Sequence, residues 1–315
     1  MTINHVILGT GAIGRAIAEE LVRRGETVRM VNRSGKMEEA PVGVEVKAAD
    51  LYDPAKVREV TQGAKVVYQA SQPEYHEWQE KFPPLQKSIL DGLTGSGAKL
   101  IIAENLYMYG STSGKPITED MPYNAHTRKG RVRAALSEAA LVAHRDGKVR
   151  VAIGRGSDYF GPWGLTSSMG ERTFYPMLHG KAGDVNGRTD IPHTHTFTKD
   201  FGKALVILGE RSEADGQPWN VPNDMPRITQ GEMIKMFAEE AGILVKIAHR
   251  GKMYYYFGGL FVPAAKEMVE MLYEFEQPFI VDSSKFENTF GMQATPIKEA
   301  MRETVAWYKS HPEKK

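Results

Sequence analysis

The chain has 315 residues, of which 41% are hydrophobic and 25% charged, and its 40 Lys and Arg against 39 Asp and Glu leave a net charge of +1. This balance argues against an electrostatic nucleic-acid-binding protein, and the length allows a large core. The sequence has no cysteine, which excludes disulfides, thiolate nucleophiles and Cys-ligated zinc. It shows neither a signal peptide nor a membrane-spanning apolar run, so we expect a cytoplasmic protein without a membrane partner.

A short apolar strand and a glycine turn open the chain. Residues 6–8 are Val-Ile-Leu, and a G-x-G-x-x-G motif with apolar residues at helical spacing follows. This order of strand, turn and helix is typical of a dinucleotide-binding unit. Gly9 permits the tight turn, Gly11 lets the backbone approach a pyrophosphate, and Gly14 lets the helix pack closely on the sheet. The pyrophosphate would lie on the free N–H groups at the start of the helix.

The end of the second predicted strand, 27–31, indicates which dinucleotide binds. The strand is followed by Asn32, Arg33 and Ser34, with no acidic residue. NAD enzymes usually place Asp or Glu here to bind the ribose 2′-hydroxyl, whereas a nearby Arg accommodates a 2′-phosphate. Arg33 can pair bidentately with that phosphate, and Ser34 adds a hydroxyl. The sequence therefore predicts NADP(H); a solvated loop arginine is the alternative interpretation of Arg33.

Further apolar runs are spaced as strands of the same sheet, at 44–48, 66–71, 99–103 and 149–153. Helical patterns alternate with them, which predicts an α/β fold with a Rossmann-type, doubly wound parallel sheet. The Pro83-Pro84 pair predicts that the helix before the fifth strand begins there, and a helix is expected over about 128–144. The predicted cofactor-binding residues are Gly9, Gly11, Ala12, Ile13, Gly14, Asn32, Arg33, Ser34, Asp50, Leu51, Gln69, Ala70 and Ser71.

Beyond Arg155 the alternation of strands and helices loosens. We expect a dinucleotide-binding Rossmann domain at 1–158 and a smaller C-terminal α/β substrate-binding lobe at 159–315. Segments near 197–222 are expected to return to the first domain.

Motifs spread over most of the length resemble the extended short-chain dehydrogenases/reductases, the NAD(P)-dependent epimerase/dehydratase family. Leu8 stands where the glycine motif of the extended family usually has its first glycine, which indicates an atypical member of that family. The resemblance implies an NAD(P)-dependent enzyme with a small-molecule substrate, and a homodimer formed through the alanine-rich helix at 132–144. Plain burial of that helix is the alternative interpretation of its alanines. The matching segments are the glycine turn, Asp50-Leu51, Gln69-Ala70-Ser71, Tyr109-Gly110, Arg155 with Gly161-Pro162, and Trp219-Asn220-Val221-Pro222.

The chain departs from this family at the catalytic pair. In the family a Tyr-x-x-x-Lys pair opens the helix after the fifth strand; its phenol transfers a proton and its lysine lowers the pKa of that phenol. One register places Thr127 and Arg131 at the pair, and another, anchored on Glu138, places Gly130 and Ala134 there. Neither register supplies the pair, and an arginine could replace only the electrostatic part of the lysine's role.

Three tyrosines remain as candidate proton donors. If the fifth strand continues to residue 107, Asn105 and Tyr107 share one face directed at the substrate. Tyr107 is then the first candidate acid, Tyr109 the second and Tyr159 the third, and Asn105 is a candidate hydrogen-bond donor to a carbonyl oxygen. Packing of aromatic side chains at strand ends is the alternative.

Residues near the end of the sixth strand and in the C-terminal lobe are candidates for contact with the substrate. Asp158 matches a family position that contacts the substrate, and Tyr159 follows it. His193 and His195 would share a strand face, but the absence of a third ligand predicts no metal site. His193 is a candidate substrate contact.

The leading hypothesis is an NADP(H)-dependent oxidoreductase that acts on a small carbonyl or sugar-like substrate with a displaced proton donor. One alternative is an NAD(P)-dependent sugar-type epimerase, and another is a catalytically silent protein that senses NADP(H). Loss of the Tyr-x-x-x-Lys pair favours the sensor, whereas the retained aromatic and polar residues favour an enzyme.

Overall fold

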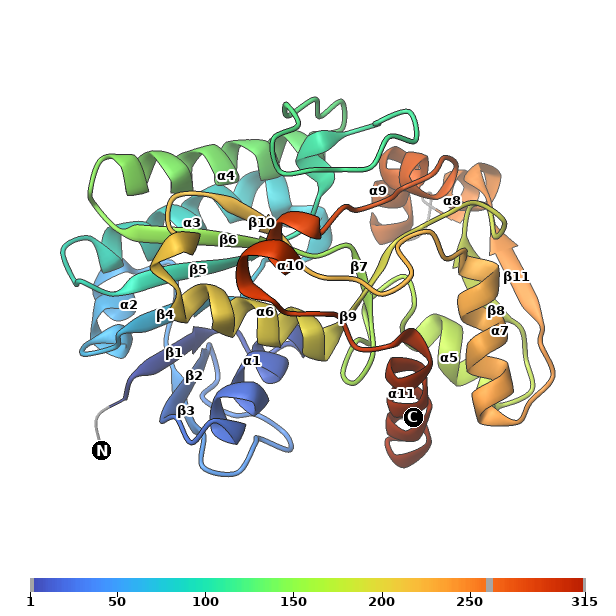
Figure 1. The fold of residues 1–315 in the computed structure, drawn as a ribbon, viewed down its shortest axis with the longest axis horizontal. Helices are drawn as coiled ribbons and strands as arrows, with labels where there is room; N and C mark the ends of the chain where they lie inside the picture. Colours follow the sequence, from blue (N-terminus) through green and yellow to red (C-terminus); the bar gives the residue numbers. More distant parts are fainter. Residues whose placement is uncertain (1–2, 259–262, 314–315) are drawn as a thin grey trace.

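The computed structural model describes residues 3–258 and 263–313. A seven-stranded sheet with the order β10-β6-β5-β4-β1-β2-β3 forms its centre, every neighbouring pair is parallel, and helices cover both faces (Figure 1). The predicted doubly wound α/β fold is confirmed. The strands are β1 (His5–Leu8), β2 (Val28–Asn32), β3 (Glu45–Ala48), β4 (Val66–Gln69), β5 (Lys99–Glu104), β6 (Arg150–Arg155) and β10 (Pro218–Asn220).

Two cores lie on opposite faces of this sheet. Because side chains alternate along a strand, Val6 and Leu8 of β1 pack into one core and Ile7 into the other. The first core contains apolar residues of α2 (Pro54–Thr61), α3 (Trp78–Leu93) and α4 (Arg128–Arg145), and the second those of α1 (Ala12–Arg23) and α6 (Thr198–Glu210). The order reverses between β1 and β4, and ligands of such sheets bind at the carboxyl ends of the strands beside that reversal.

The second half of the chain builds a smaller lobe beside the sheet (Figure 1). Its core centres on Phe174 and Phe237, whose rings stack 4.1 Å apart. β7 (Asp158–Phe160) pairs with β9 (His195–Phe197), and β8 (Gly183–Asn186) with β11 (Ile247–Arg250). The remaining helices are α5 (Glu171–Leu178), α7 (Gln230–Ala241), α8 (Lys252–Gly258), α9 (Pro263–Met271), α10 (Ser284–Phe290) and α11 (Ile297–Ser310). Phe286 of α10 packs into the second core of the sheet. The 3-10 turns among the described residues are η1 (Tyr75–Glu77), η2 (Tyr107–Tyr109), η3 (Ser212–Ala214) and η4 (Leu272–Phe275).

Two local predictions are wrong. α3 begins at Trp78 and runs through Pro83 and Pro84, because burial of Trp78 and Phe82 outweighs the two lost backbone hydrogen bonds while both prolines face solvent. β5 ends at Glu104 and the chain turns into η2 at Tyr107. Asn105 and Tyr107 therefore do not share a strand face.

No helix within 3–258 and 263–313 is both long enough and apolar enough to cross a membrane.

Candidate active site

The three glycines of the first turn differ in what their missing side chains allow. A Cβ at Gly9, whose φ is +124°, would lie 2.7 Å from the backbone of Ala70 and Ser71. A Cβ at Gly14 would lie 2.3 Å from the carbonyl oxygen of Gly9, whereas one at Gly11 would meet no protein atom within 4 Å. Gly9 and Gly14 are thus required by the packing of the chain, and Gly11 borders open space.

That open space has the chemistry of a phosphate site. No side chain caps the first turn of α1, so its N–H groups are free to bind an anion. At the end of the adjacent β4, Gln69 Oε1 and Ser71 Oγ are buried and have no hydrogen-bond partner. The residues therefore fit a dinucleotide that crosses the turn between β1 and α1.

The polar residues at the end of β2 differ in whether the fold already uses their side chains for hydrogen bonds. Asn32 Oδ1 accepts hydrogen bonds from the N–H groups of Ser34 (3.0 Å) and Gly35 (2.7 Å), and its Nδ2 donates to Thr10 Oγ1 (3.1 Å). Asn32 thus holds the turn and ties it to the glycine motif. The Arg33 side chain is exposed, which leaves its guanidinium accessible to a ligand.

The residues that follow β3 complete this edge of the site. Asp50 Oδ1 accepts a hydrogen bond from the Tyr52 N–H (3.0 Å), and Leu51 is buried. Burial raises the pKa of the Tyr52 phenol, and the nearby charges of Lys81 and Arg33 oppose that shift. Arg33 and Tyr52 consequently flank one surface at the ends of β2 and β3.

The start of α4 contains the residues that the two registers set against the family's Tyr-x-x-x-Lys pair. Thr127 is the N-cap, and its Oγ1 accepts a hydrogen bond from the Gly130 N–H (3.0 Å). Arg131 is exposed and donates to the His126 carbonyl oxygen (2.8 Å), so its charge points away from the buried face of α4. A Cβ at Gly130 would lie 2.6 Å from the carbonyl oxygen of Tyr107, so the η2 turn occupies the room of a side chain at position 130.

Tyr109 belongs to a buried polar network. Its hydroxyl accepts a hydrogen bond from the Arg155 guanidinium and donates one to the Glu119 carbonyl oxygen (3.4 Å). Arg155 is fully buried and also binds Glu104 Oε2 (2.9 Å). Burial raises the pKa of Tyr109 above its ordinary range, and these partners commit its hydroxyl to joining β5, β6 and η2.

Tyr107 lies in an aromatic cluster with Tyr75 and Trp78. The Trp78 ring is 5.0 Å from that of Tyr75 and 6.0 Å from that of Tyr107, measured between centroids. Burial, followed by the neighbouring Tyr75, raises the pKa of Tyr107 well above its ordinary value, so its phenol is protonated at neutral pH. Asn105 Oδ1 accepts a hydrogen bond from the Tyr107 N–H (3.3 Å), which places its amide beside this cluster.

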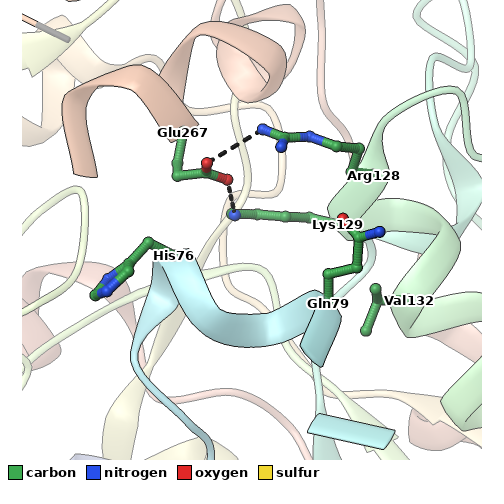
Figure 2. Close-up of a pocket in the computed structure, with 6 residues that line it drawn as sticks. All are labelled: His76, Gln79, Arg128, Lys129, Val132 and Glu267. Atoms are coloured by element: carbon green, nitrogen blue, oxygen red, sulfur yellow. Dashed lines mark hydrogen bonds and ion pairs between the residues drawn. The ribbon is translucent and has the colours of Figure 1, made fainter. Parts of the chain in front are cut away.

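Two cations of α4 flank the cluster, and the sequence reasoning missed both. Lys129 Nζ lies 4.2 Å from the centroid of the Tyr75 ring and forms an ion pair with Glu267 of α9 (Figure 2). Glu267 also binds Arg128 (3.1 Å), so it bridges two neighbouring residues of α4 over a small pocket that His76 and Gln79 help to line (Figure 2).

Arg133 is the second cation, one helical turn further along. Its Cζ lies 4.2 Å from the Trp78 ring centroid and 4.5 Å from that of Phe82, and its guanidinium donates to Gln72 Oε1 (3.2 Å). Helical spacing could have found this pair, because residues 129, 133, 136 and 140 lie on the buried face of α4.

The C-terminal lobe contributes an ion pair. Asp158 Oδ2 is 2.8 Å from His193 Nε2, and His193 Nδ1 is 3.0 Å from the backbone oxygen of Glu274. Both ring nitrogens of His193 therefore face oxygen atoms, one of a carboxylate and one of the main chain. Burial alone would raise the pKa of Asp158, but the hydrogen bond and charge of His193 hold it below its ordinary value.

Other titratable groups surround this pair. Burial lowers the pKa of His195 to about 3, and both its ring nitrogens are buried without a partner. Burial also raises the pKa of the Glu274 carboxyl well above its ordinary value, and Tyr273 donates a hydrogen bond to it (3.2 Å). The Tyr159 hydroxyl lies 3.3 Å from Thr166 Oγ1. The structure thus brings the predicted Asp158 and His193 together and adds Glu274, for which the sequence carried no signal.

Within the part of the chain that the structure describes, no group of three or more His, Asp or Glu side chains is arranged to hold a metal ion.

Comparisons with known proteins show the fold and the family of this chain. No curated protein sequence matches the chain. Among solved structures, UDP-N-acetylglucosamine 4-epimerase from Bacillus cereus superposes with a TM-score of 0.79 at 14% identity, covering 99% of both chains. UDP-glucuronic acid 4-epimerase from Bacillus cereus in complex with NAD gives 0.78 at 14% identity, covering 98% of this chain and 97% of the other.

The dTDP-glucose 4,6-dehydratase from Bacillus anthracis in complex with NAD gives a TM-score of 0.77 at 14% identity, with 98% and 97% of the two chains covered. These likenesses show a shared fold. The profile of the NAD dependent epimerase/dehydratase family matches residues 6–221. The chain therefore belongs to the NAD dependent epimerase/dehydratase family, which supports a nicotinamide dinucleotide as its cofactor.

Proposed function

We propose that the protein is an NADP(H)-dependent oxidoreductase that acts on a small carbonyl or sugar-like compound. The observation that carries this proposal is the open space at Gly11, which borders uncapped N–H groups of α1 on one side and the buried, unpartnered Ser71 hydroxyl on the other. Family membership supports a dinucleotide there.

The phosphate on the ribose is assigned to Arg33. Its exposed guanidinium follows β2, where no acidic residue competes for the ribose hydroxyls. Asn32 holds the turn in shape, and Ser34 adds a hydroxyl to its surface. The residues proposed to hold the cofactor are Gly9, Gly11, Ala12, Ile13, Gly14, Asn32, Arg33, Ser34, Asp50, Leu51, Gln69, Ala70 and Ser71.

A bound nicotinamide dinucleotide supplies hydride transfer, and the chain must supply the proton. Tyr107 is the proposed acid, because its turn fills the room beside Gly130, where one register places the family's tyrosine. The Asn105 amide is the proposed hydrogen-bond donor to the substrate oxygen. Asp158, held ionised by His193, is proposed to accept hydrogen bonds from substrate hydroxyls.

A panel assay tests the proposal. We expect NADPH absorbance to fall when the protein is mixed with small aldehydes, α-dicarbonyls or ketosugars. Tyr107→Phe should then lower kcat by about 100-fold, the lower end of the effect of general acid catalysis. Tyr256→Phe, which removes the hydroxyl of an exposed tyrosine on α8, is the matched control. Equal rates in wild type and Tyr107→Phe would reject Tyr107 as the acid.

A sugar epimerase is the second candidate, favoured by structural neighbours that are nucleotide-sugar 4-epimerases. Such an enzyme would return its cofactor unchanged. Interconversion of UDP-sugars without net change in NADPH or NADP⁺ would identify it.

We further propose that the protein works in the cytoplasm as a homodimer. α4 exposes Ala135 and Ala139, small residues that allow two helices to approach closely. Sedimentation analysis tests the oligomeric state.

A further inference from the structure

The helices α8 and α9 are attached to the rest of the protein with little apolar packing. Among their described side chains only Tyr255 and Met271 are buried, and neither belongs to a core of the sheet or of the lobe. Large side chains of α8 lie in solvent, namely Met253, Tyr254, Tyr256 and Phe257. Tertiary packing supplies most of the stability of a short helix, so α9 needs another interaction to hold it in place.

The contacts that fasten α9 are ionic, and they converge on the start of α4 (Figure 2). Glu267 forms ion pairs with Lys129 and with Arg128 (3.1 Å). Glu270 Oε2 accepts a hydrogen bond from the Arg128 backbone N–H (2.9 Å) and lies 3.5 Å from the Arg128 guanidinium. Carboxylates are favoured at the positive end of a helix, and partial burial shields these pairs from screening by salt.

The attached position of α9 also carries costs. Glu270 Oε1 is buried without a hydrogen-bond partner, and the Lys129 side chain is only 4% exposed. Movement of α9 away from α4 would let water reach both groups and relieve these costs. The ion pairs and the costs oppose each other, which is the balance expected of a segment that opens at a modest free energy.

α9 covers the part of the site where the proton donor is proposed. It packs against η1 and η4, the turns that flank the site. Lys129 Nζ, while paired with Glu267, stands 4.2 Å from the centroid of the Tyr75 ring. That ring belongs to the same aromatic cluster as Tyr107. The ionic attachment of α9 therefore lies directly over this cluster.

We propose that α9 is a strap over the substrate site, which Glu267 and Glu270 hold shut and which opens to admit substrate and release product. The proposal rests on the proposed function for the placement of the substrate at Tyr107. The closed strap keeps water away from the aromatic cluster, where hydride and proton are to be transferred. Because salt screens ion pairs, the fraction of molecules with an open strap rises with ionic strength.

Hydrogen exchange followed by mass spectrometry tests the strap in the full-length protein without cofactor or substrate. The double variant Glu267→Gln, Glu270→Gln keeps the size of both side chains and removes their charges. We expect its backbone amides at 267–271 and in η1 to exchange about tenfold faster than in the wild type, because exchange follows the fraction of open molecules. Raising NaCl from about 0.05 M to about 0.5 M should speed this exchange in the wild type and change the double variant little.

Glu239→Gln, which neutralises an exposed carboxylate of α7 in the same lobe, is the control and should leave exchange at 267–271 unchanged. Exchange within threefold of the wild type in the double variant would overturn the proposal. An equal acceleration in α5 would also overturn it, because the whole lobe would then have loosened. If the double variant does not fold, Arg128→Gln, which removes a partner of both carboxylates, takes its place under the same criteria.

The exchange experiment and the turnover assay fail separately. A wild type that consumes no NADPH with any compound of the panel would count against the proposed function. The exchange rates at 267–271 decide by themselves whether the two glutamates hold α9 against α4.

Discussion

Replacing Gly11 with alanine tests the affinity for NADPH separately from the stability of the fold. Gly11 has φ −74° and ψ −173°, a backbone conformation that alanine adopts, and its added Cβ would touch no protein atom within 4 Å. Alanine is a poorer N-cap than glycine by about 0.5 kcal/mol, but it lowers the entropy of the unfolded chain by about 0.4–1 kcal/mol. The two effects nearly cancel, so Tm should change by less than about 4 °C.

The same methyl group stands where the pyrophosphate is proposed to pass. We expect Gly11→Ala to weaken NADPH binding by about tenfold or more, which is about 1.4 kcal/mol. Fluorescence titration with NADPH measures this loss directly. At 100 times the wild-type Kd, NADPH should stabilise the wild type by about 2.7 kcal/mol, a rise of roughly 5–10 °C in Tm. A variant that binds tenfold more weakly should gain about 1.4 kcal/mol at the same concentration, about half of that rise.

Gly14→Ala is the contrasting variant. Its Cβ would lie 2.3 Å from the Gly9 carbonyl oxygen, a backbone atom held by the β1–α1 turn, so we expect a loss of stability of about 3 kcal/mol. Wild-type NADPH affinity in Gly11→Ala would refute the placement of the pyrophosphate, and wild-type stability in Gly14→Ala would refute the packing argument.

Two further predictions concern the cofactor and acid stability. Arg33→Ala should weaken the binding of NADP(H) by roughly 10- to 100-fold, about 1.5–3 kcal/mol for charge-assisted hydrogen bonds, and leave the binding of NAD(H) nearly unchanged. Isothermal titration calorimetry with both dinucleotides measures the two affinities. Equal losses for the two would reject the assignment of Arg33 to the phosphate. His195 has its folded pKa lowered from 6.5 to about 3, so its contribution to stability is present above pH 6.5 and is lost as the pH falls toward 3. Urea denaturation should therefore show that His195→Asn loses less stability than wild type between pH 6.5 and 4, by up to about 1.4 kcal/mol per pH unit, and parallel curves would contradict the burial argument.

Short-range patterns were enough to predict the parallel sheet. The apolar run at 6–8 and the glycines after it depend only on neighbouring residues, and the structure has the predicted strand and helix there. The predicted start of a helix at about residue 128 likewise agrees with α4, whose N-cap is Thr127. The prolines of α3 misled the prediction because the energy that decides its start comes from the burial of Trp78 against other elements.

The candidate site was harder to predict because its residues meet across long sequence separations. Asp158 and His193 were both named as substrate contacts, yet their pairing depends on how β7 and β9 align. Lys129 reaches Glu267 from a helix more than a hundred residues away, and nothing local to either residue indicates that contact. The position of Glu274 near the site is set by the η4 turn, and the packing of that turn in the lobe is not visible in the local sequence.

The crowding at Gly130 limits which substitutions this chain can accept. A single substitution cannot place a tyrosine at that position, because the oxygen of residue 107 already fills the volume its first carbon would need. Any variant with a side chain at position 130 would have to rebuild the loop after the fifth strand at the same time. Such a change requires a new main-chain path as well as a new residue, so selection acting one codon at a time meets a steric barrier there.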